Sequence, residues 1–113
     1  MNDILKQIDE VLEARKSESA DSSYVASLYH KGTEKILKKI AEEAMETVMA
    51  AKDLEHNNNS ESDKEHLVYE IADLWFHTMV LLASQNLSSN DVTAELQRRF
   101  GLSGLEEKAS RSE

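Results

Sequence analysis

Residues 67–83 read LVYEIADLWFHTMVLLA, and this stretch decides the fold class. Apolar residues dominate from Leu74 to Ala83, so a helix here needs burial on several sides. Ser62 and Glu65 form a capping-box pattern just upstream, which predicts that the helix begins near residue 62. The sequence therefore predicts a long helix with neighbours on more than one side.

Helical signals recur on both sides of this segment. A second long helix is expected over about residues 33–55, capped by Thr33, and a polar loop follows at 56–61. Shorter helices are expected over about residues 2–16, 24–32 and 88–100. No stretch shows a strand pattern, and zero prolines and three glycines leave little turn chemistry for a sheet. The fold class is predicted to be all-α.

The size and composition of the chain exclude several classes of protein. With 113 residues and 12.8 kDa, the chain is expected to form one domain over residues 1–113, because two cores would each be too small. A formal net charge of -9 argues against a nucleic-acid partner. The lack of cysteine excludes a disulfide framework, a thiolate zinc site and a cysteine nucleophile. No apolar run approaches the roughly 20 residues of a membrane span, and no secretory signal is recognised, so we expect a cytoplasmic protein without a membrane partner.

Two pairs of acidic residues lie on the long helices at spacings that put each pair on one face. Glu43 and Glu46 are three residues apart on the first helix, and Glu70 and Asp73 are three apart on the second. If the helices form a hairpin about a loop centred near Ser60, Glu43 matches Asp73 in height and Glu46 matches Glu70, to within roughly one helical turn of 5 Å. The four carboxylates would then face one another.

Such a cluster has two interpretations. Like charges about 4 Å apart repel by a few kcal/mol at an effective dielectric near 20, so either the carboxylates point to water or they hold a hard dication. Ligands that are all oxygen favour Mg²⁺ or Mn²⁺ over zinc. The pattern alone leaves both interpretations open, although Glu70 and Asp73 interrupt the most apolar segment of the chain.

Basic residues gather just before the first acidic pair. They are Lys31, Lys35, Lys38 and Lys39. One interpretation is that they form ordinary surface ion pairs along the helix with Glu34, Glu42 and Glu43. The other is a phosphate clamp beside a metal, because lysine point charges suit polyphosphate oxygens.

The remaining notable side chains on these helices are interpreted as core. His77 is a lone histidine on a largely buried helix, and such a residue is more often a satisfied core residue than a ligand. A di-iron bundle would need a Glu-x-x-His repeat on two helices, and neither His66 nor His77 follows a glutamate at that spacing. We expect Trp75 and Phe76 in the core or in a subunit contact. The core is also expected to contain Met45, Met49 and Met79.

Several stretches of sequence form a pattern that extends over nearly the whole chain. They are YVASL at 24–28, KG at 31–32, KILKK at 35–39, EEAME at 42–46, LVYEIADL at 67–74, RRF at 98–100 and SGLEEKASR at 103–111. Together they resemble the phosphoribosyl-ATP pyrophosphatases of histidine biosynthesis. The EExxE…ExxD core alone is typical of the wider MazG-like all-α nucleotide pyrophosphohydrolases, and the lysine segment and the tail narrow the choice. Ala41 departs from the glycine expected in the family, a mild change inside a helix.

The resemblance implies an activity and a metal site. The activity is Mg²⁺-dependent hydrolysis of 1-(5-phosphoribosyl)-ATP to 1-(5-phosphoribosyl)-AMP and pyrophosphate, by attack of water at the α-phosphorus. Carried over residue by residue, the metal ligands and catalytic acids would be Glu43, Glu46, Glu70 and Asp73, with Glu42 supporting them as a further ligand. An acidic protein can bind a polyanion in this way, because metal ions bridge the two.

The resemblance also implies phosphate contacts and an assembly. Lys31, Lys35, Lys38 and Lys39 would bind the substrate phosphates, and Lys108 and Arg111 in the tail would reach one as well. Family members are dimers in which helices from two chains pack into one bundle. We therefore expect a homodimer whose interface includes part of the apolar segment 74–82.

Two alternatives to this function differ in what they predict. A house-cleaning (d)NTP pyrophosphohydrolase would share the metal site and differ in the substrates that it accepts. A non-catalytic acidic helical interaction module would neither bind Mg²⁺ nor gain thermal stability from it.

Overall fold

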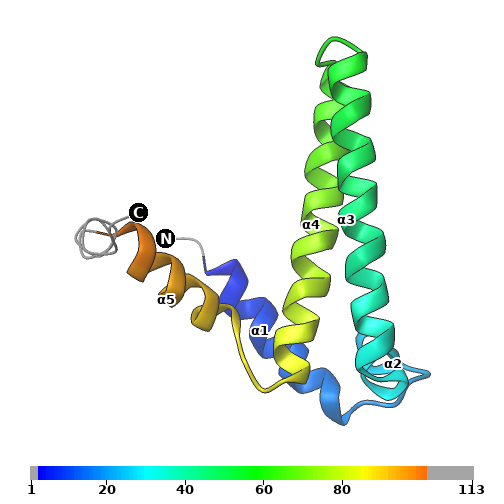
Figure 1. Ribbon diagram of the computed structural model, residues 1–113. Coiled ribbons are helices and arrows are strands. Elements are labelled where there is room, and N and C mark those ends of the chain that lie inside the picture. Colours follow the sequence, from blue (N-terminus) through cyan, green and yellow to red (C-terminus); the bar gives the residue numbers. More distant parts are fainter. Residues whose placement is uncertain (1–2, 102–113) are drawn as a thin grey trace.

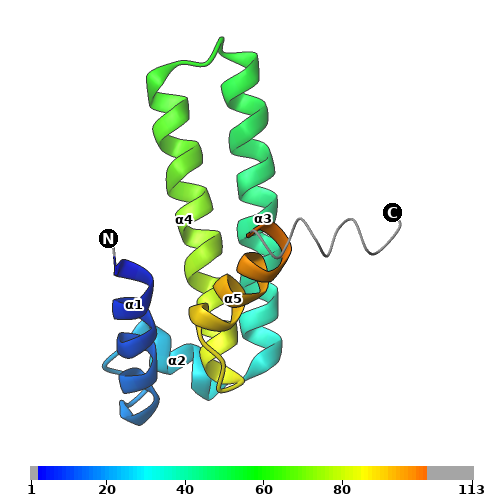
Figure 2. The same ribbon diagram turned by 90° about the vertical axis from the view of Figure 1, so that its left-hand side faces the viewer.

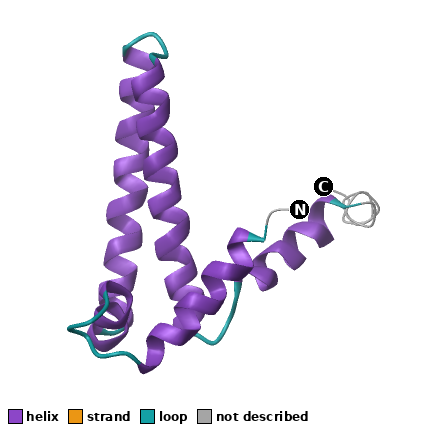
Figure 3. Cartoon of the chain, turned by 180° about the vertical axis from the view of Figure 1, so that it is seen from behind, coloured by secondary structure: helices purple, strands orange, loops and turns teal. Residues whose placement is uncertain are grey.

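The protein, in a computed structural model that describes residues 3–101, is built from helices, with no strand among the described residues (Figure 3). The helices are α1 Ile4–Ala14, α2 Tyr24–Lys31, α3 Thr33–His56, α4 Glu61–Ser84 and α5 Ser89–Phe100, and a short 3₁₀ turn, η1 Arg15–Ser17, follows α1. The predicted all-α class is confirmed.

The two longest helices, α3 and α4, form an antiparallel hairpin (Figure 1). Its loop contains Asn58 and Asn59 with φ angles of 57° and 58°, a left-handed conformation that asparagine tolerates better than most residues. Ser60 caps α4 by accepting a hydrogen bond from the backbone N–H of Asp63 at 3.3 Å, and its hydroxyl donates to the Asp63 carboxylate at 2.7 Å. The prediction of Ser62 as the cap was therefore wrong. The bonds with an acid three residues later are made by Ser60, which lies two residues before Ser62.

Gly32 joins α2 directly to α3. Its φ of 94° lies in the region that favours glycine, and its N–H donates to the Leu28 carbonyl at 3.0 Å, which ends α2. Because Gly32 is also the N-cap of α3, the predicted cap Thr33 is instead the first helical residue. This single-residue connection holds α2 at the base of the hairpin.

Helix α1 packs against the base of α4, and α5 packs against α1 (Figure 1 and Figure 2). The predicted capping box of Ser88 and Asp91 opens α5, with the Ser88 N–H donating to the Asp91 carboxylate at 2.9 Å. Asp9 of α1 accepts from the backbone N–H and the hydroxyl of Ser89, at 3.0 and 2.6 Å. These bonds fix the start of α5 against α1.

The hydrophobic core lies at the base of the hairpin. Its buried members are Leu12, Val25, Leu28, Ile36, Met79, Val80 and Ala83. The far half of the hairpin is two helices thick (Figure 1), so apolar side chains on its outer faces stay in contact with solvent. Met79 is buried as predicted, but Met45 and Met49 are 58% and 59% exposed, so their placement in the core of this chain was wrong.

Helix α4 is also long and apolar enough, by length and composition alone, to cross a membrane. Core helices of soluble proteins meet the same criterion. Polar Glu70 and His77 are both buried along this helix, whereas Trp75 on it is 59% exposed. The apolar character of α4 is therefore divided between the core at the base and an uncovered outer surface.

Candidate functional site

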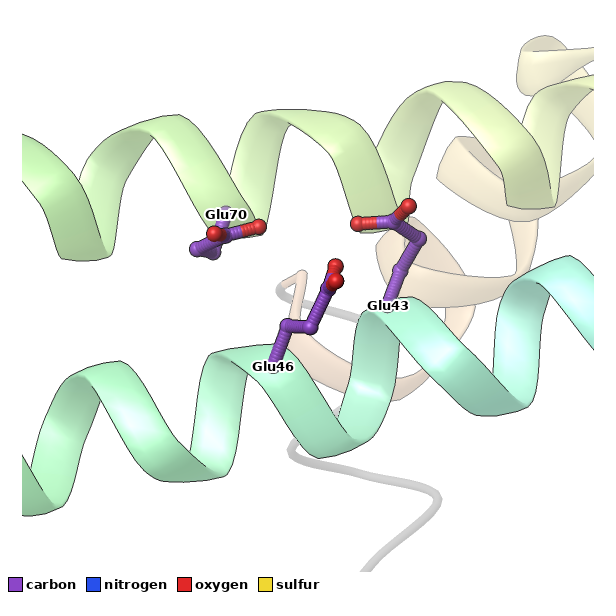
Figure 4. A group of neighbouring side chains, drawn as sticks. All are labelled: Glu43, Glu46 and Glu70. Carbon is purple, nitrogen blue, oxygen red and sulfur yellow. The ribbon is translucent and has the colours of Figure 1, made fainter.

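Three carboxylates from α3 and α4 converge between the two helices (Figure 4). Glu43 and Glu46 project from α3 toward α4, and Glu70 projects back from α4. One carboxylate oxygen from each lies within 4.8 Å of the others. Glu43 and Glu70 are buried and Glu46 is exposed, so this acid cluster of Glu43, Glu46 and Glu70 is reached by solvent at Glu46.

The environment of the Glu43 carboxylate is one that a bound cation would stabilise. Its Oε2 atom is buried and has no hydrogen-bond partner. Burial, followed by the neighbouring Glu46 and Asp73, raises the pKa of Glu43 to about 7, although Lys39 opposes the rise. A hard dication would supply the missing partner and offset the repulsion, so these oxygen ligands fit Mg²⁺ or Mn²⁺.

The raised pKa of Glu43 predicts how the stability of the metal-free protein depends on pH. A carboxyl whose folded pKa of about 7 exceeds its unfolded value of 4.5 binds more protons in the folded state, so stability falls as pH rises between those values. Glu43→Gln removes this loss. In chelator, the variant should melt at a higher temperature than the native protein at pH 8, and the difference should shrink toward zero near pH 4.5.

The control for this prediction is Glu61→Gln, because Glu61 carries the same charge in an exposed position at the start of α4. It should give no stabilisation at pH 8. Thermal unfolding by circular dichroism measures both variants. An equal or lower melting temperature for Glu43→Gln at pH 8 would contradict the assignment of repulsion to this site.

The other two predicted metal ligands flank the acid cluster. Asp73 is half-buried, lies one turn beyond Glu70 on α4, and is outside the group whose oxygens meet within 4.8 Å. Its charge still contributes to the raised pKa of Glu43. Glu42 is exposed and pairs with Lys39 at 3.4 Å. The structure thus brings three of the five predicted ligands into one group and leaves two at its edge.

The predicted phosphate-binding lysines are placed differently from one another. Lys39 lies at the acid cluster, with its Nζ atom 3.6 Å from Glu43 and 3.4 Å from Glu42. Within residues 3–101, Lys31, Lys35 and Lys38 form no ion pair with an acid. The surface ion-pair interpretation therefore holds for Lys39 alone. Lys108 and Arg111 lie outside the described residues.

Two contacts at the site were missed from the sequence. His66 Nε2 lies 2.9 Å from a Glu70 oxygen, and the four-residue spacing on one helix was a signal that could have found it. Tyr24 Oη lies 2.9 Å from His77 Nε2. These residues are 53 positions apart in the sequence, so no local sequence pattern predicts the contact. His77 itself is buried with both ring nitrogens in hydrogen bonds, as predicted for a satisfied core histidine.

Comparison with known proteins identifies the family of the chain. Residues 5–100 match the model of the family described as phosphoribosyl-ATP pyrophosphohydrolase. A phosphoribosyl-ATP pyrophosphatase of Hydrogenovibrio crunogenus is 66% identical over 111 residues, which are 98% of this chain and 95% of that protein. Proteins of the same name from Chromobacterium violaceum and Ruthia magnifica are 60% and 57% identical, over 96% and 99% of this chain and 94% and 99% of theirs. The chain therefore belongs to the phosphoribosyl-ATP pyrophosphohydrolase family.

Proposed function

We propose that this protein hydrolyses 1-(5-phosphoribosyl)-ATP to 1-(5-phosphoribosyl)-AMP and pyrophosphate, in the cytoplasm, as a step of L-histidine biosynthesis. The observation that carries the proposal is the acid cluster, in a chain whose relatives bear the name of this enzyme over almost their full length. A buried carboxylate oxygen without a partner has no structural use in a two-helix hairpin, but it suits a metal-dependent hydrolase.

In this proposal the acids of the hairpin hold the cation. Glu43, Glu46, Glu70 and Asp73 are the ligands, with Glu42 supporting them, and Mg²⁺ is the cofactor, with Mn²⁺ able to replace it. A dication bound there would neutralise charge on the triphosphate and lower the pKa of a bound water. A carboxylate of the set that is not bound to the metal would take the proton as water attacks the α-phosphorus. The rigid helices hold these acids in place before the substrate arrives.

The lysines act on the phosphates. Pyrophosphate leaves with more negative charge than it carried in the substrate, so ammonium groups beside it lower the barrier. Lys31, Lys35 and Lys38 have no acid partner within the described chain, which leaves their charge available for phosphate oxygens. Lys39 already lies at the acid cluster. Lys108 and Arg111 are proposed to contact a further phosphate from the tail.

We also infer a homodimer. An apolar groove of about 340 Å³ lies on the outer face of α4, between α1 and α5. Its lining is Leu5, Trp75, Thr78, Met79, Leu82, Ser89, Val92, Thr93 and Leu96. The groove overlaps the segment 74–82 that the sequence assigns to a subunit contact. A second copy covering it would complete a bundle around the exposed hairpin, and would account for the apolar surface of α4 without a membrane.

The test of the activity is pyrophosphate release by the purified protein, with and without Mg²⁺. We expect rapid release from 1-(5-phosphoribosyl)-ATP in Mg²⁺ and none in chelator. The same assay with ATP and the common dNTPs separates the specific enzyme from a house-cleaning one, because only the latter would hydrolyse them at comparable rates. A protein that released no pyrophosphate and gained no thermal stability from Mg²⁺ would be the non-catalytic helical module instead.

A further inference from the structure

The first turn of α5 is held by a side chain of another helix. Asp9, in the middle of α1, accepts two hydrogen bonds from Ser89, the first residue of α5: one from the backbone N–H at 3.0 Å and one from the hydroxyl at 2.6 Å. The N–H groups of a first helical turn have no partner within their own helix, and the positive end of the helix dipole lies there. The Asp9 carboxylate therefore stabilises the start of a helix that lies 80 positions away in the sequence.

A further bond holds the connection between α4 and α5 to the same part of the chain. Lys16, in the 3₁₀ turn after α1, donates to the side-chain oxygen of Asn86 at 3.0 Å. This bond is exposed, whereas Ser89 is 8% exposed, so the Asp9–Ser89 pair is better shielded from water. The direction in which α5 leaves the hairpin is thus fixed by polar bonds to α1 and its turn.

The apolar side of α5 is left largely uncovered. The helix has 12 residues, a length at which a helix is only marginally stable in water without tertiary contacts. Val92 and Leu96, which line the apolar groove, are 43% and 47% exposed. Phe100, at the end of the helix, is 76% exposed. Polar bonds to α1 therefore carry much of the task of holding α5 in the single chain.

The shape of the groove depends on the direction of α5. Leu5 of α1, Leu82 of α4 and Leu96 of α5 all line it, so it exists only while α5 stands away from α4. The residues that line the groove are all uncharged. Two copies of a chain with a net charge of -9 repel each other, and an uncharged surface is where they meet with the least repulsion.

The exposed surface of α4 has the right character to enter such a groove. Val68 and Ala72 are exposed and precede Trp75 at helical spacing, so an apolar line continues from the groove along α4. A two-fold axis pairs the same patch on both copies, so each copy offers one groove and one apolar line to the other. The occupant that fits the groove is therefore α4 of a second copy.

We propose that Asp9 is a positioning residue for assembly: by holding Ser89 it fixes α5 as one wall of the groove, against which α4 of a second copy packs. Because the wall is already in place, association does not have to order it, and the dimer is tighter by that amount. The inference rests on the homodimer of the proposed function, and it adds the residues that prepare the contact surface.

The test is Asp9→Ala, read as the Kd of the dimer in sedimentation equilibrium. Loss of hydrogen bonds to a charged group should raise this Kd by about 10- to 100-fold. Asp9→Asn keeps one acceptor oxygen and should have a smaller effect. In a Trp75→Asp background, where a charge in the groove keeps the copies apart, Asp9→Ala should also quicken amide hydrogen exchange across α5 and leave α3 unchanged.

The matched control is Glu10→Ala. Glu10 is the next residue of α1, is exposed, and makes no side-chain hydrogen bond or ion pair within residues 3–101. Its substitution removes the same charge, so it should leave the Kd unchanged or slightly lower, and α5 exchange should not change. Ser89→Ala completes a double-mutant cycle: once Asp9 is replaced, it should have almost no further effect.

The outcomes separate this inference from the proposed function. In a dimeric protein, equal effects of Asp9→Ala and Glu10→Ala on the Kd would overturn the role of Asp9. Additive effects of Asp9→Ala and Ser89→Ala, or unchanged exchange across α5, would do the same, and so would a lower melting temperature at an unchanged Kd. A native protein that stays monomeric would overturn both the homodimer and this inference. The proposed reaction is decided separately by pyrophosphate release, because Asp9 and Ser89 lie outside the acid cluster.

Discussion

Glu46→Gln is expected to lower the rate of pyrophosphate release by about three orders of magnitude or more, because the metal supplies both charge neutralisation and the activated water. The change keeps the size of the side chain and removes one charge from the acid cluster. Stability in chelator should hold or rise, since Glu46 is one of the groups that raise the pKa of the buried Glu43. Lost turnover with an unchanged or higher melting temperature is the informative combination.

Asp73→Asn extends the test to an acid at the edge of the cluster. If Asp73 is a ligand, its substitution should match Glu46→Gln in effect, although its oxygens lie outside the group of three that meet within 4.8 Å. Glu61→Gln, at the exposed start of α4, changes the charge equally and should leave turnover unchanged. Near-normal turnover in both site variants would contradict the assignment of the metal site, and with it the proposed enzymatic mechanism.

Trp75→Asp should convert the homodimer to monomers. In the single chain Trp75 is 59% exposed, so the fold of the protomer can accept a charge there. In a subunit contact the same carboxylate would be desolvated without a partner, at a cost of several kcal/mol. Met79→Asp should instead unfold the chain, because Met79 is 6% exposed and belongs to the core. Light scattering should give twice the 12.8 kDa chain mass for the native protein and a single chain mass for Trp75→Asp.

Leu37→Asp is the control for assembly. Leu37 lies on α3, is 43% exposed and does not line the groove, so an added charge there should leave the dimer intact. A native protein of single-chain mass at micromolar concentration would show that no homodimer forms. A Trp75→Asp variant that remained dimeric would move the interface to another surface.

Much of the hairpin could be predicted from the sequence, because helix formation depends on residues that are near one another in the chain. Helical spacing and one height comparison across a loop were enough to expect Glu43, Glu46 and Glu70 to face one another, and the structure brings them together. Helix ends were less predictable. A serine cap was expected for α4, but Ser60 and Ser62 both precede an acid by three residues, and the reciprocal bonds with Asp63 decide between them.

Burial and long-range contacts could not be read from periodicity. Met45 and Met79 were both expected in the core, yet only Met79 meets it, because α1 and α2 cover the base of the hairpin and no described element covers its far half. Tyr24 and His77 meet because a left-handed residue at Gly32 folds α2 back against the hairpin. A sequence shows which residues are apolar or polar, but it does not show which of two similar faces another helix will cover.

The tight bend between α3 and α4 has a consequence for how the chain can be altered. Its asparagines are exposed, and it lies at the far end of the hairpin from the core (Figure 1). The relative positions of the acid cluster residues are set by the packing of α3 against α4 and by the core at the base. They do not depend on the length of the loop between the two helices. Loop closure becomes only slightly less favourable as a loop lengthens, so the bend is where the chain tolerates inserted polypeptide. A fluorescent reporter or an affinity sequence placed between Asn58 and Asn59 would extend into solvent and leave the acid cluster as it is.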